Sequence, residues 1–141
     1  MNKIQPITCA ATNDLSVTIP DPSGKNIVLY FYPKDSTPGC TIEGQDFRDH
    51  KDDFDNLNTV IYGVSRDSLK SHENFKSKQN FNFELISDPD ETLCKLFDVV
   101  KLKKMYGKEH MGIVRSTFII DSDGNIVKEW DNVKVDGHVE E

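Results

Sequence analysis

Hydrophobic residues in this chain gather in short runs separated by segments with helical patterning. The clearest run, residues 27–32, is continuous, apolar and aromatic, which is typical of a strand covered on both faces. A turn cluster at residues 21–24 precedes this strand. Earlier still, residues 7–19 mix β-branched and small side chains. They predict a weak hairpin at the edge of a sheet.

Helix and strand signals alternate after that first strand. Thr37 as an N-cap and Pro38 at the first helical position predict a helix start. Apolar residues at loosely helical spacing continue this helix through residues 42–57, although Gly44 costs it about 1 kcal/mol relative to alanine. Residues 59–65 then predict a strand, and residues 69–79 a helix capped by position 67 or 68.

The remaining elements are shorter. Residues 83–86 predict a third strand, and residues 87–91 combine a capping residue, a proline and acids, as at a helix start. The next segment, residues 100–114, is a lysine-rich connection that we interpret as a surface loop, with a small basic patch near the site as the alternative. Residues 116–121 and 125–130 predict a terminal hairpin that turns at Asp123-Gly124.

This order of elements, β-α-β-α-β-α-β-β, predicts the α/β class with a mixed central sheet flanked by helices on both faces. It is the arrangement of a thioredoxin-like fold, and residues 1–141 are expected to form a single domain. The carboxyl-terminal helix that such a fold would add is expected to be short or missing. A neighbouring molecule covering that face is the alternative.

Charge and composition exclude several function classes. The formal net charge is −7, which argues against nucleic acid as a partner. No apolar run has the length of a membrane span, and no secretory leader is visible at the start, so we expect a cytoplasmic protein. The four histidines (His50, His72, His110 and His138) lack metal-ligand spacing and are interpreted as surface residues. We therefore expect no metal and no cofactor.

Three cysteines, Cys9, Cys40 and Cys94, form no C-x-x-C pair, and their odd number suits a reducing compartment. Cys40 falls in the first turn of the helix predicted after residues 27–32. The free backbone N–H groups and the dipole of that turn favour thiolate over thiol. Gly39, without a side chain, would let a small substrate approach the backbone. The alternative is a small core residue near a helix start.

Residues 30–44, Tyr-Phe-Tyr-Pro-Lys-Asp-Ser-Thr-Pro-Gly-Cys-Thr-Ile-Glu-Gly, closely resemble the active-site segment of the peroxiredoxins. They are most similar to the subfamily known as bacterioferritin comigratory protein, or peroxiredoxin Q. The signature Pro-x-x-x-Thr-x-x-Cys falls on Pro33, Thr37 and Cys40. Further similarity at residues 46–49, 85–88 and 115–121 extends the resemblance from about residue 27 to residue 137.

The resemblance implies a thiol-dependent peroxidase, an antioxidant enzyme that reduces hydrogen peroxide and organic hydroperoxides. Cys40 would be the peroxidatic nucleophile that becomes a sulfenic acid. Arg115 would stabilise the thiolate and the leaving oxygen, Thr37 would hydrogen-bond at the sulfur or peroxide, and Pro33 would shield the sulfur from water. Glu43 would orient the arginine. On local grounds alone, Thr37 could be only a cap and Pro33 only a strand terminator.

The chain departs from the family at the resolving cysteine. Many members have one five residues after the peroxidatic cysteine, where this chain has Gln45, and others have one near residues 75–76, where it has none. Cys94 is expected to be a core thiol, and Cys9 a buried strand residue or a distant partner. We therefore expect a one-Cys enzyme, monomeric or weakly dimeric, whose sulfenic acid is open to overoxidation and is reduced by glutathione, a glutaredoxin or a thioredoxin. The rival interpretations are a peroxide sensor or redox-switched binding protein with little turnover, and an inactive thioredoxin-fold module.

Overall fold

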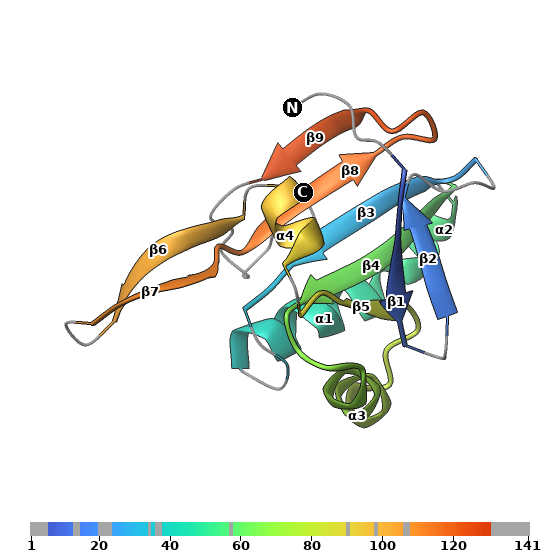
Figure 1. Cartoon of the computed structure of the whole chain (residues 1–141). Coiled ribbons are helices and arrows are strands. Elements are labelled where there is room, and N and C mark those ends of the chain that lie inside the picture. The colour runs from blue at the N-terminus through green and yellow to red at the C-terminus, as the bar shows by residue number, and fades with distance from the viewer. Residues whose placement is uncertain are drawn as a thin grey trace.

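The computed structural model describes residues 6–12, 15–19, 24–33, 35, 38–56, 58–89, 91–97, 99–105 and 108–130. Within them, seven strands form one mixed sheet in the order β2-β1-β5-β4-β3-β8-β9 (Figure 1). These strands are β1 (Ile7–Ala11), β2 (Leu15–Ile19), β3 (Asn26–Phe31), β4 (Thr59–Ser65), β5 (Glu84–Ser87), β8 (Ser116–Ile120) and β9 (Ile126–Trp130). The thioredoxin-like arrangement expected from the sequence is confirmed. The expectation that the closing helix is short or missing concerns residues 131–141, which lie outside the described residues.

β3 lies inside the sheet, between β4 and β8. It pairs in parallel with β4 and antiparallel with β8, in a register that places Tyr30 beside Gly63 and Thr117. β4 pairs in parallel with β5. The β1–β2 hairpin extends the edge beyond β5, so the predicted edge hairpin is confirmed.

Alternate side chains of β3 enter two separate hydrophobic clusters, one on each face of the sheet. Ile27, Leu29 and Phe31 belong to one cluster, and Val28 and Tyr30 to the other. Strand side chains alternate between faces, which explains why a continuous apolar run suits a strand buried on both sides.

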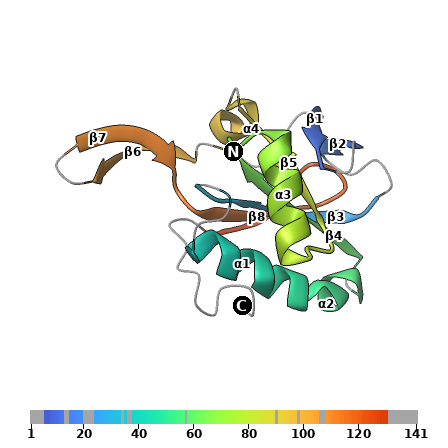
Figure 2. The ribbon, with the colours of Figure 1, turned by 90° about the horizontal axis from the view of Figure 1, so that it is seen from below.

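Helices cover both faces of the sheet, as predicted. α1 (Pro38–Asp49), α2 (Lys51–Asn56) and α3 (Leu69–Gln79) pack on the face of Tyr30, and α4 (Thr92–Leu96) packs on the other (Figure 2). The single helix expected over residues 38–57 is therefore two, with a turn at His50 between them. Ile42, expected on the apolar face, is 50% exposed instead.

Local signals account for the helix ends. Ser68 caps α3 by accepting a hydrogen bond from the backbone N–H of Ser71, as one of the two predicted caps. α4 begins later than residues 87–91 suggested. Its cap comes from Asp88, whose carboxylate accepts the backbone N–H groups of Leu93 and Cys94.

The interpretation of residues 100–114 as a loop was wrong. They form a second, two-stranded sheet of β6 (Val100–Met105) and β7 (Lys108–Ile113), which projects from the body of the molecule (Figure 1). Cross-strand pairs such as Val100 with Ile113 join its strands, and the lysine-rich composition concealed the alternation. No helix within the described residues is long and apolar enough to cross a membrane.

Candidate active site

Cys40 is the third residue of α1 and lies at the carboxyl end of β3, on the face of the sheet that carries Tyr30. Its side chain is only 2% exposed. Phe47, on the same helix, stacks on Tyr30 with ring centroids 4.4 Å apart, which holds α1 against β3. Gly44 allows α1 to pack closely on Phe81 as well, because a Cβ at that position would stand 2.3 Å from the ring of Phe81. Cys40 therefore occupies the first turn of a tightly packed helix, as the sequence predicted.

Arg115 provides the positive charge of the site. It lies between β7 and β8, and its Nη2 donates to the sulfur of Cys40 across 3.3 Å. Its Nη1 donates to Oε1 of Glu43 across 2.6 Å. Burial disfavours the charge on Arg115, but Glu43 and Cys40 outweigh this effect and raise its pKa further. The guanidinium of Arg115 thus bridges the Glu43 carboxyl group and the Cys40 thiol. The sequence proposed these three residues together.

Glu43 has an unusual environment for a carboxyl group. Its side chain is fully buried, and burial raises its pKa to about 7 despite the attraction of Arg115. Its Oε2 and the hydroxyl of Tyr30 are buried without a hydrogen-bond partner within the described part of the chain. Burial raises the pKa of Tyr30 well above its usual value, with further contributions from Glu43 and Cys40. The sequence did not indicate that Tyr30 is a neighbour of this site, because a buried aromatic residue is ordinary in a central strand.

The other residues of the predicted site are placed less completely. Pro33 follows the end of β3 and is partly buried. Gly39 is the second residue of α1. Thr37 lies outside the described residues, so its predicted contact with the sulfur or peroxide stays a prediction.

The sheet separates Cys40 from the other two cysteines. Cys40 belongs to the cluster of Tyr30, whereas Cys94 belongs to the cluster on the opposite face and Cys9, on β1, packs against that same cluster. All three thiols are free. Burial, with Asp88 nearby, raises the pKa of Cys9 to about 11 and that of Cys94 still further. Cys94 is fully buried, so the expectation of a core thiol is confirmed.

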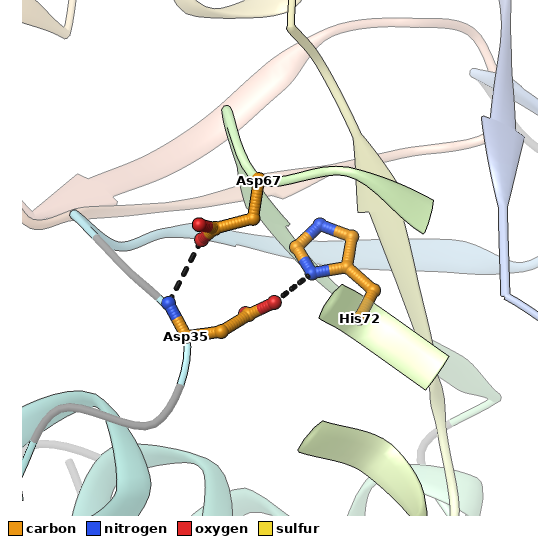
Figure 3. Close-up of side chains that lie close together, drawn as sticks. All are labelled: Asp35, Asp67 and His72. Carbon is orange, nitrogen blue, oxygen red and sulfur yellow. Dashed lines mark hydrogen bonds and ion pairs between the residues drawn. The ribbon is translucent and has the colours of Figure 1, made fainter. Parts of the chain in front are cut away.

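One group of side chains resembles a metal site in composition. Ligand atoms of Asp35, Asp67 and His72 lie within 4.8 Å of one another (Figure 3). The interpretation of His72 as a surface residue was wrong, because its side chain is completely buried. The carboxylates of the group already accept hydrogen bonds from protein donors, including the hydroxyls of Ser65 and Ser71.

Comparisons with known proteins agree with this geometry. The AhpC/TSA family matches residues 2–129. The chain is 56% identical to Peroxiredoxin Bcp of Xanthomonas campestris over 118 residues, covering 84% of this chain and 74% of that protein. It is also 56% identical to Peroxiredoxin Bcp of Bacillus subtilis over 126 residues, covering 89% and 80%.

Solved structures show the same similarity. A mutant of Xanthomonas campestris Peroxiredoxin Q superimposes with a TM-score of 0.90 at 50% identity, covering 95% of this chain and 85% of the other. A structure of the bacterioferritin comigratory protein of that organism, described in connection with its alkyl peroxide reduction activity, gives a TM-score of 0.90 at 49% identity with the same coverage.

The fold and these relatives define a thiol-dependent peroxidase of the thioredoxin-like class. The chain belongs to the AhpC/TSA family, within which it is a peroxiredoxin of the Bcp or peroxiredoxin Q type. Both the family resemblance and the peroxidase activity inferred from it are thereby confirmed.

Proposed function

We propose that Cys40 is the peroxidatic residue and that this protein reduces hydrogen peroxide and small organic hydroperoxides, including alkyl peroxides. The observation that carries the proposal is the 3.3 Å contact between Nη2 of Arg115 and the Cys40 sulfur. A guanidinium at that distance is placed to stabilise negative charge at the sulfur during the reaction, in which the thiolate is the nucleophilic form of cysteine. The position of Cys40 in the first turn of α1 acts in the same direction.

In the reaction, the Cys40 thiolate attacks one peroxide oxygen and the O–O bond breaks. The sulfur is oxidised to a sulfenic acid, and the second oxygen leaves as alkoxide or hydroxide and takes up a proton. Arg115 stabilises the negative charge as it moves from sulfur to the leaving oxygen. Pro33 and Thr37 are proposed to shield the sulfur and to hydrogen-bond with it or with the peroxide. Gly39 would leave room for the substrate beside the backbone.

We further propose a one-Cys cycle. Gln45 occupies the position of a near resolving cysteine and donates to the side chain of Gln79 on α3 instead. The clusters of Cys9 and Cys94 lie across the sheet from Cys40, so an internal disulfide would require the core to open. An external thiol, such as glutathione, a glutaredoxin or a thioredoxin, is then the reductant. The cytoplasm, where such thiols are kept reduced, is the proposed location.

The test is oxidation of the reduced protein by hydrogen peroxide in a stopped-flow instrument, with Cys40→Ser as the matched variant. We expect wild type to react at least about 100-fold faster than a free thiol and to gain one oxygen by intact mass. The variant should not react on this timescale. A wild-type rate no greater than that of a free thiol would contradict the assignment of Cys40.

A further inference from the structure

A buried polar network surrounds Asp35, which lies between β3 and α1, five positions before Cys40. Its carboxylate accepts hydrogen bonds from the hydroxyls of Tyr32 (2.6 Å) and Ser71 (2.8 Å). The same carboxylate contacts Nδ1 of His72 at 2.7 Å. The backbone N–H of Asp35 donates to the carboxylate of Asp67 across 2.8 Å (Figure 3). Asp35 is thus held by the side chains of Tyr32, which follows β3, of Ser71 and His72 on α3, and of Asp67 in the β4–α3 turn.

The hydrogen positions of His72 follow from its partners. Its Nε2 lies 2.9 Å from the carbonyl oxygen of Ile86, which can only accept, so Nε2 carries a hydrogen. Between Nδ1 and the Asp35 carboxylate, 2.7 Å apart, one further proton is required, because two lone pairs would repel at that distance. The contact is therefore a hydrogen bond with one proton between the two side chains. The side chain of His72 is 0% exposed and that of Asp35 is 3% exposed.

A buried pair of this kind contributes little net stability compared with apolar residues of similar volume, because both groups lose their hydration. What it does provide is a fixed geometry, since both atoms must stay within hydrogen-bond distance to avoid an unpaired buried polar group. Here that geometry is imposed on Asp35, which stands between Pro33 and the first turn of α1.

We propose that the Asp35–His72 pair positions the start of α1, so that the Cys40 sulfur is directed at Arg115. His72 is then a positioning residue for peroxide reduction, acting through Asp35 from α3. This role rests on the proposed function of Cys40.

Two substitutions of His72 separate its hydrogen bond to Asp35 from its hydrogen bond to the Ile86 carbonyl. In His72→Asn the amide nitrogen stands near the place of Nδ1 and can donate to Asp35. In His72→Gln it reaches the place of Nε2 and can donate only to the Ile86 carbonyl. His50→Gln is the control, because His50 is a surface residue that contacts Asp53, away from the site. Folding is checked for each variant by circular dichroism and urea titration.

The rate constant for oxidation of Cys40 by hydrogen peroxide is then measured, together with alkylation of the Cys40 peptide by iodoacetamide. We expect His72→Gln to lose about 10- to 100-fold in peroxide rate, since misplacement by about 1 Å can have that effect, and to be alkylated at least as fast as wild type. His72→Asn should stay within about threefold of wild type in both reactions. General loss of packing would not separate the two variants in this way.

Equal rates in all variants, or equal losses in His72→Asn and His72→Gln, would overturn the proposal. If His72→Gln does not fold, Ser71→Ala and Tyr32→Phe each remove one hydroxyl donor to Asp35. Each should then lower the peroxide rate, and wild-type rates in both would overturn the proposal. An inert wild-type protein would instead indicate failure of the Cys40 assignment.

Discussion

Arg115 and Glu43 form a salt bridge of 2.6 Å in which the carboxylate is completely buried and the guanidinium is 16% exposed. The two residues are 72 positions apart in the chain. Because the carboxylate fixes one arm of the guanidinium, the other arm is directed at the Cys40 sulfur. The surroundings of the proposed peroxidatic thiol therefore depend on its contact with this buried pair.

Replacing Arg115 with lysine is expected to lower the rate of peroxide reduction by about 100-fold or more. The planar guanidinium donates to Glu43 and to the sulfur at once, whereas a single ammonium group cannot reproduce both contacts. Stopped-flow oxidation measures the effect. Arg48→Lys is the matched control, since Arg48 donates to the Gln79 carbonyl and to Asp49, away from the sulfur. A lysine variant as fast as wild type would contradict this role.

The ionisation of Glu43 is expected to make stability depend on pH. Burial raises its pKa from 4.5 in the unfolded chain to about 7 in the folded protein, so the folded state holds a proton that the unfolded state releases. The free energy of unfolding should therefore fall by about 3 kcal/mol as pH rises from about 4.5 to 7.

Urea denaturation of wild type and Glu43→Gln across that pH range tests this prediction. The stability of wild type relative to the variant should decrease with rising pH. The exposed Glu129, on β9, provides the control substitution Glu129→Gln. A difference between wild type and Glu43→Gln that stays constant over pH would show that Glu43 does not titrate in this way.

Alanine at Cys9 or Cys94 is expected to leave the peroxide rate within about twofold of wild type, because both side chains pack on the far face of the sheet from Cys40. Cys94→Ala should lower stability by about 1 kcal/mol, since it empties a fully buried position. Peptide mapping after one equivalent of peroxide provides the second measurement. A disulfide from Cys40 to either residue would refute the one-Cys cycle.

Gly44→Ala is expected to destabilise the protein by about 1–3 kcal/mol, although alanine favours helices more than glycine does. The new Cβ would meet the ring of Phe81, which cannot retreat because it packs on Phe75 and Phe83. Thermal and urea unfolding measure the loss. The double variant Gly44→Ala, Phe81→Leu should recover part of it, and equal losses in the single and double variants would disprove the proposed clash.

Much of the fold could be predicted because its signals are local. The bounds of β4 and α3 follow from a β-branched run and from a serine cap, each contained within a few residues. The β6–β7 hairpin was missed because its lysine-rich strands resemble a loop until they are paired. The start of α4 was placed too early because Asp88 caps it from outside the helix.

The sequence by itself determined the family and predicted the reactive cysteine and the residues that could support it, since these are carried by a contiguous motif around Cys40 and a short segment at Arg115. Only the tertiary structure decided that the arginine bridges Glu43 and the sulfur, and that the sheet separates Cys40 from the other thiols. It also decided that His72 is buried against Asp35, 37 residues away. Chain spacing carries no information about such contacts, because they form only when the sheet and helices pack and exclude water from both partners.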